Sequence, residues 1–458
     1  MGVSGSRDTL LSVFNRFDNY PLLIRALAGE LARYKRAPGD FDAWLTTHQD
    51  FQPILNRLQQ GEAKSHVLRY ALQGLTEDEQ RVLHTIAAFR MPASYDTLWA
   101  LLVKDNTPIS SESVLDTILF NLEDRGVLGW DRAANRYDLH PIVRSVVWGE
   151  LDSTTRTSIH TARVSHFQPI SRIKQDNIEK FEDLTPAVEL YYTLIGLGRY
   201  DDAFIVFRDH LVHATHYRLS ANRQRIELLE SLFPDGVGVD HLPRLTKTSA
   251  QAYTLIALAL AYKVSGLCGQ AAPLYRLGIE LAKQRNNQRN VSTGLRNLSN
   301  ALRQSGSLHL TEHAARQALI INHDQSNHFE EASGLQSIGL TLATRHTPFS
   351  LFPETEGVQL QNTGMRAAQT ALRCTYQIAI VQNQKQLEGT ATAFLAQIAL
   401  WHSDLSAAQQ LANRAWKLAH HQGYERDFIA ATRLQGEAAL GLNDFVTADE
   451  RLHHALTR

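Results

Sequence analysis

The residue best placed to do chemistry is His140, which ends an Asp-Leu-His tripeptide directly before a helix signal that begins at Pro141. Residues 126–130 and 136–139 alternate apolar and polar side chains around a polar turn, which predicts a β-hairpin. A histidine between a hairpin and a helix start can hydrogen-bond a phosphate, because its ring nitrogens donate or accept. We therefore expect His140 to sense a phosphate held by a neighbouring domain.

Three helix signals precede this hairpin, at residues 77–89, 94–103 and 111–125, and helix, helix, helix, hairpin is the order of a winged-helix domain. The third helix is the one that would read DNA in such a domain. It carries four acidic residues against a single arginine: Glu112, Asp116, Glu123, Asp124 and Arg125. Acidic side chains repel the phosphate backbone, so we expect a packing module that binds no DNA.

These motifs resemble the C-terminal part of the STAND-class signalling ATPases, the family of NB-ARC proteins with a repeat sensor. The tripeptide ending at His140 is similar to the family's Met-His-Asp motif, although here the histidine comes last. The segment Tyr20-Pro21-Leu22-Leu23, which opens a helix predicted over residues 23–33, is similar to its Gly-x-Pro motif, with Asn19 in place of glycine. The resemblance implies that Pro21 packs near an adenine and that His140 faces a β-phosphate.

The sequence contains no Gly-x-x-x-x-Gly-Lys-Ser/Thr loop, whose amides and lysine hold nucleotide phosphates. No catalytic motif is found elsewhere, so we expect no enzyme activity. Residues 3–11 are similar to the stretch that follows the ATPase core in the family. The chain is therefore expected to be the part after that core, as a fragment, half of a split gene or a decayed remainder. ADP or ATP would bind only together with an ATPase core of the same or a neighbouring polypeptide.

The composition fits a mostly helical protein of several domains, with 458 residues of which 43% are hydrophobic. A net charge of −1 gives no electrostatic reason to expect a nucleic acid or a membrane surface as partner. The two cysteines, Cys268 and Cys374, are far apart, which favours a reducing cytoplasm over a disulfide scaffold. The longest apolar stretch, residues 255–262, is too short to span a bilayer.

Internal repetition organises the second half of the chain. Ser265-Gly266 recurs 40 residues later as Ser305-Gly306, and Ser403-Asp404 recurs 40 residues later as Asn443-Asp444. Residues 197–203 have the turn of a tetratricopeptide unit. The pattern resembles the long-period tetratricopeptide arrays of STAND regulators and predicts an α-solenoid. Two stretches rich in proline and glycine, residues 231–244 and 347–363, predict long loops.

One helix of this array carries a candidate binding face. Arg296, Asn300 and Arg303 share one side of a helix at spacings of four and three residues, and we expect that side to face the concave groove. Arginine and asparagine there can hold a carboxylate or a phosphate of a protein partner or inducer. The alternative is a solvated charged face.

Of the 20 histidines, His210, His213 and His216 lie three residues apart, a spacing that does not converge on one metal, so no metal site is expected.

The sequence thus predicts a mainly α fold in four segments: a helical domain of NB-ARC type over 1–61, a winged-helix domain over 62–151, a helical linker over 152–183 and a tetratricopeptide-like array over 184–458. The resemblance implies sensing and relay in signal transduction, with the array binding an inducer and the winged helix coupling it to a nucleotide switch. A stand-alone tetratricopeptide adaptor is the alternative, and part of a transcriptional regulator is another.

Overall fold

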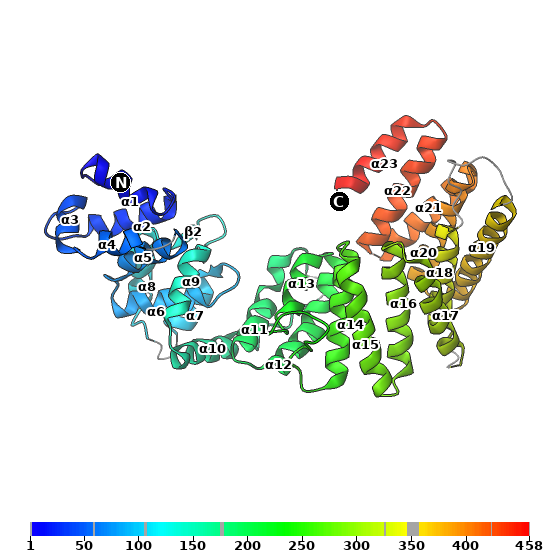
Figure 1. The fold of residues 1–458 in the computed structure, drawn as a ribbon, viewed down its shortest axis with the longest axis horizontal. Coiled ribbons are helices and arrows are strands. Elements are labelled where there is room, and N and C mark those ends of the chain that lie inside the picture. Colours follow the sequence, from blue (N-terminus) through cyan, green and yellow to red (C-terminus); the bar gives the residue numbers. More distant parts are fainter. Residues whose placement is uncertain are drawn as a thin grey trace. The chain divides into compact units, whose positions relative to one another are not determined.

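The computed structural model describes residues 2–57, 60–104, 108–174, 178–324, 327–345, 357–422 and 424–457. The chain forms two compact units (Figure 1). Unit 1 comprises Met1–Arg172 and Thr185–Arg199, and unit 2 comprises Ile173–Leu184 and Tyr200–Arg458. In both units the described elements are almost all helices, as the sequence predicted.

Unit 1 begins with five helices packed around buried aromatic side chains. Their bounds are α1 Arg7–Asn15, α2 Pro21–Ala32, α3 Phe41–Thr47, α4 Phe51–Arg57 and α5 Gln60–Leu72. Trp44 and Phe51 are buried, and their rings lie edge to face at 5.0 Å between centroids. Tyr70 on α5 stands edge-on to both rings, so aromatic packing joins α3, α4 and α5.

The next part of unit 1 has the order of elements that the sequence predicted, with one more strand. Its elements are α6 Glu77–Ala87, β1 Ala93–Ser94, α7 Tyr95–Leu102, α8 Glu112–Asp124, β2 Gly129–Asp131, β3 Arg136–Asp138 and α9 Pro141–Glu150. The strands form an antiparallel sheet in the order β1-β3-β2, with Trp130 opposite Tyr137. The hairpin places His140 as the N-cap residue of α9.

Close backbone packing joins these two parts of unit 1. A Cβ added to Gly29 on α2 would lie 2.8 Å from the carbonyl oxygen of Arg125, so only glycine allows α2 to touch the end of α8. The buried Arg125 side chain donates to the Gly74 carbonyl at 2.8 Å and lies 3.3 Å from the Glu30 carboxylate. The expected border at residue 61 therefore lies inside one compact unit, and the borders at 61 and 151 stay predictions.

Helices α10, Ser153–Phe167, and α11, Thr185–Gly196, complete unit 1. The sequence assigned α11 to the repeat array that was expected to begin at residue 184. The structure groups it with unit 1, because its Glu189 is buried in an ion pair with Arg163 of α10. Glu189 also accepts hydrogen bonds from the Arg90 and Met91 amides at 3.0 and 2.7 Å.

Unit 2 starts with short elements of mixed type. They are η2 Phe181–Leu184, α12 Tyr200–Val206, the π-helical turns η3 Phe207–Leu211 and η4 Ala214–Arg218, and α13 Asn222–Glu230. Residues 231–247 contain no regular element, which confirms the first of the two predicted loops. Residues 346–356 of the second loop lie outside the described residues. The end of that loop was predicted wrongly, because α19 already begins at Gly357, at a helix end where glycine is tolerated.

The rest of unit 2 is an α-solenoid of antiparallel helical hairpins in which consecutive helices pack together (Figure 1). Its helices are α14 Thr248–Val264, α15 Cys268–Gln284, α16 Gln288–Gln304, α17 Leu308–Asp324, α18 His328–Arg345, α19 Gly357–Val381, α20 Lys385–Trp401, α21 Leu405–Gln422, α22 Glu425–Gly441 and α23 Phe445–Thr457. The bounds of α14 and α15 return 40 residues later in α16 and α17, which confirms the repeat period. Gly266 and Gly306 have φ angles of 81° and 80° in equivalent turns.

Candidate functional site

A groove runs along the first helices of successive hairpins in unit 2. It contains two adjoining cavities of about 850 and 840 Å³. Both take residues from α14, α16, α18, α20 and α22, and they share Lys263, Asn300, Gln336, Lys385, Gln386, Thr390, Tyr424 and Arg426. Each cavity is as large as a typical small-molecule pocket, so together they suit an extended ligand.

The structure places all three residues of the predicted binding face on this groove. Arg296 lines one cavity, Arg303 lines the other, and Asn300 lines both. The guanidinium of Arg296 lies 3.6 Å from the Glu330 carboxylate, and burial lowers the pKa of Arg303. Neither cation is a freely solvated surface charge. Both the partner-binding role and the solvated alternative for this face stay predictions.

Four further cations face the same groove and were not among the predicted site residues. Lys263, Arg225, Lys385 and Arg426 lie on α14, α13, α20 and α22, respectively. Burial, reinforced by the nearby charges of Arg426, Arg296 and Arg303, lowers the pKa of Lys263 to about 7. The available signal was the repeat register, since Lys263 lies 40 residues before Arg303.

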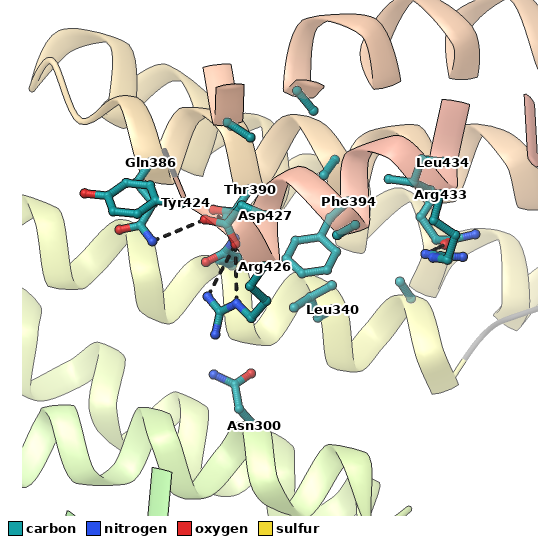
Figure 2. Close-up of a pocket in the computed structure, with 18 of the residues that line it drawn as sticks. Asn300, Leu340, Gln386, Thr390, Phe394, Tyr424, Arg426, Asp427, Arg433 and Leu434 are labelled. Carbon is teal, nitrogen blue, oxygen red and sulfur yellow. Dashed lines mark hydrogen bonds and ion pairs between the residues drawn. The ribbon is translucent and has the colours of Figure 1, made fainter. Parts of the chain in front are cut away.

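The wall opposite α16 is held by a polar cluster at the start of α22 (Figure 2). Asp427 accepts a hydrogen bond from the Gln386 amide at 3.2 Å and pairs with Arg426 at 3.4 Å. Figure 2 shows the Arg426 side chain extending from Asp427 toward Asn300 on the other wall. Arg426 and Asn300 can therefore contact one ligand from two sides of the groove.

Two rings from distant parts of the array meet at the wall of the groove. The rings of Tyr217 on η4 and Tyr424 lie 5.9 Å apart between centroids. His216 beside Tyr217 lines the cavity, and burial followed by the charges of Arg225 and Arg426 lowers its pKa to about 3. The π-helical turns set this placement, so the regular helical spacing assumed for the three histidines was wrong. The described residues contain no group of three or more potential metal ligands.

In unit 1 the structure brings together the two segments that were predicted to face a nucleotide. Pro21 is the first residue of α2, and its neighbour Tyr20 contacts His140. The Tyr20 hydroxyl lies 2.8 Å from Nε2 of His140, and the Ile142 amide donates to Nδ1 at 3.3 Å. Because Nδ1 accepts, the ring proton is on Nε2, which donates to the Tyr20 oxygen. A phosphate that accepts a hydrogen bond from Nε2 of His140 would have to displace the Tyr20 hydroxyl.

Charged side chains connect the His140 segment to α11 within unit 1. Asp138 pairs with Arg144 of α9, whose guanidinium also donates to the Ala87 carbonyl at 3.4 Å. One residue further, the Ala88 carbonyl accepts from Arg163 at 2.8 Å, and Arg163 pairs with Glu189. Arg144 and Arg163 thus bind the carboxyl end of α6, where cations are favourable.

Comparisons with known proteins give no family assignment. No family model matches the chain, and no curated protein matches it. Similar solved structures include a STAND protein with a tetratricopeptide repeat sensor from Pyrococcus horikoshii, at 14% identity over 85% of this chain and a TM-score of 0.36. This chain spans only 58% of that protein.

Two other similar structures are BtubC and a Rap protein. BtubC (BKLC) from P. vanneervenii shares 15% identity, with 52% of this chain and 88% of that chain covered and a TM-score of 0.35. A Rap protein complexed with competence and sporulation factor shares 10% identity over 66% of this chain and 92% of that chain, with a TM-score of 0.38. Likenesses this low carry no conclusion about function. No helix among the described residues is long and apolar enough to cross a membrane.

Proposed function

We propose that this chain is the sensor and relay part of a STAND-type signal-transduction protein. Its repeat array binds a protein partner or inducer in the groove of unit 2. Unit 1, through Pro21 and His140, couples that binding to the nucleotide state of an ATPase core in the same or a neighbouring polypeptide. In this proposal ADP or ATP is bound by the joined core, because this sequence lacks a phosphate-binding loop.

The observation that carries the binding role is the groove itself. Five successive first helices contribute side chains to two adjoining cavities. Concave surfaces of helical repeats are extended binding faces, and arginines often anchor partners there. Asn300 lines both cavities, Arg296 lines one and Arg303 the other, so a partner that fills the groove would contact all three.

The observation that favours a relay is the Tyr20 to His140 contact. The two residues are 120 positions apart, yet they meet at the segments that the family resemblance assigns to the nucleotide site. Both ring nitrogens of His140 are engaged within the unit, so a competing phosphate would change the contacts of α2 and α9 together. Such an exchange of partners is a discrete two-state event of the kind that signalling requires.

Hydrogen exchange tests the relay on the chain as it is. Peptides that bind the groove are first selected from a random library displayed on phage. The relay predicts that a saturating peptide changes amide exchange in α9 of unit 1 as well as in α14, α16 and α22. Asn300→Trp, which fills the groove where the cavities meet, should abolish both changes.

A stand-alone adaptor for protein–protein interaction is the second candidate, favoured by the size of the groove alone. It predicts exchange changes in unit 2 and none in α9, an outcome that would reject the relay. If no selected peptide lost its binding through Asn300→Trp, the groove would not be a partner site and both functions would fail.

A further inference from the structure

One of the two cavities is lined by cations without any acidic residue. The cavity of about 840 Å³ is lined by five basic side chains, Arg225, Lys263, Arg296, Lys385 and Arg426, while no aspartate or glutamate is among the described residues that line it. A cavity with low-dielectric walls and charges of one sign attracts ligands of the opposite sign. This part of the groove, which we call the basic chamber, therefore favours an anionic ligand.

Ion pairs leave two of the five cations unneutralised. Carboxylates outside the chamber pair with three of them: Glu330 lies 3.6 Å from Arg296, Glu388 lies 3.0 Å from Lys385, and Asp427 lies 3.4 Å from Arg426. Arg225 and Lys263 have no ion-pair partner within the described part of the chain. The unmatched positive charge of the chamber thus resides on Arg225 of α13 and, at a pH below the lysine pKa of about 7, on Lys263 of α14.

Arg225 is the lining residue that most clearly favours an anionic ligand, because two nitrogens of its guanidinium lack partners in the described structure. Its side chain is buried, with the residue only 3% exposed, yet its Nε and Nη1 atoms have no hydrogen-bond partner in the described structure. A buried guanidinium without partners is costly, because both its charge and its donors lose their hydration. Tyrosines, not carboxylates, surround it, and burial lowers its pKa. A carboxylate of a ligand in the chamber would offset the unpaired guanidinium charge.

The other lining residues indicate what carries that anion. Side-chain amides, which both donate and accept, recur along the chamber in Asn290, Asn297, Asn300, Gln336, Gln384 and Gln386. Peptide backbones present N–H donors and C=O acceptors in alternation, and such side-chain amides can pair with both. Ile256, Leu260 and Leu387 add apolar surface for side chains. The chamber also continues into the second cavity, which suits an extended chain.

We propose that the basic chamber binds an acidic peptide segment, one of whose carboxylates is anchored by Arg225 and Lys263. This inference rests on the proposed partner-binding role of the groove and specifies the chemistry of the partner. Arg296 and Arg426, which already have carboxylate partners, line the path of the segment toward Asn300. Arg225 is thus the anchor that the sequence pattern did not reveal.

Selection of peptides tests this directly. Peptides from a random library on phage are selected against the full chain, and those whose binding is lost with Asn300→Trp are kept as groove ligands. These are expected to be enriched in aspartate and glutamate. For a synthetic groove ligand, Arg225→Met should raise the Kd about tenfold or more, which corresponds to about 1.4 kcal/mol, and added salt should weaken binding.

Two further variants separate the effect of the Arg225 charge on binding from an effect on folding. Arg225→Lys keeps the charge and should retain part of the affinity, while Arg276→Met, an exposed arginine of α15 outside both cavities, should change nothing. Groove ligands without acidic enrichment would overturn the acidic-peptide inference and leave the partner-binding role intact. An absence of groove ligands would overturn both. Tighter binding of ATP than of any selected peptide, lost with Arg225→Met, would replace the peptide by a phosphorylated small molecule.

Discussion

Removing the charge of Arg225 should make the free protein more stable. The side chain is 3% exposed and its Nε and Nη1 atoms lack partners. Leaving a buried donor unsatisfied costs about 1–3 kcal/mol, and more when the group is charged. Methionine keeps a long unbranched side chain and needs no hydrogen bond, so little packing is lost. We expect Arg225→Met to raise the free energy of unfolding by about 2 kcal/mol, or the thermal midpoint by about 4–8 °C.

Urea and thermal unfolding, followed by circular dichroism without ligand, measure this gain. The same variant should bind groove peptides more weakly, so stability and affinity move in opposite directions. Residues retained for binding at a cost in stability behave in this way. Arg276→Met is the matched control and should shift neither quantity. A loss of stability in Arg225→Met would show that the guanidinium has a structural partner and would refute the reasoning.

Three other outcomes follow from the titratable groups. Glu189→Gln should lower the free energy of unfolding by about 3–5 kcal/mol in urea melts, because it leaves the buried Arg163 charge unpaired. Burial lowers the pKa of Lys263 to about 7, so this side chain loses its charge as the pH rises through that value, and peptide affinity should fall over the same range. Calorimetry of the Lys263→Met variant should show no such fall. Tyr20→Phe should cost about 0.5–1.5 kcal/mol in urea melts by removing the hydrogen bond to His140, and an unchanged midpoint would contradict that contact.

Local signals explain why the helices around the hairpin could be predicted closely. Thr76, Ser94 and Ser111 each accept a hydrogen bond from an amide in the first turn of the helix that follows. Such caps are visible in a single sequence, so α6, α7 and α8 start within one residue of the predicted positions. Strand β1 was missed because it is only two residues long and is defined by its pairing with β3.

The division of the chain into two units depends on contacts between distant residues, which a local sequence pattern does not reveal. Glu189 lies on α11, an apolar helix whose sequence gave no reason to separate it from the array. Its burial against Arg163, 26 residues earlier, assigns it to unit 1. A buried ion pair is specified by two side chains at once, so a reading of either helix alone cannot find it.

The groove shows the same limit for function. Helical spacing correctly placed Arg296, Asn300 and Arg303 on one face, because that relation lies within a single helix. Whether Arg225 on α13 and Arg426 on α22 face one chamber depends on how each hairpin turns relative to the last, and small rotations accumulate over an array. The solenoid thus collects single cations from distant helices into one basic chamber. Each cation taken alone resembles an ordinary charged residue of an exposed helix face. If the acidic peptide is correct, its affinity should depend on both ends of this array, and substitution on α13 should impair binding as strongly as substitution on α16.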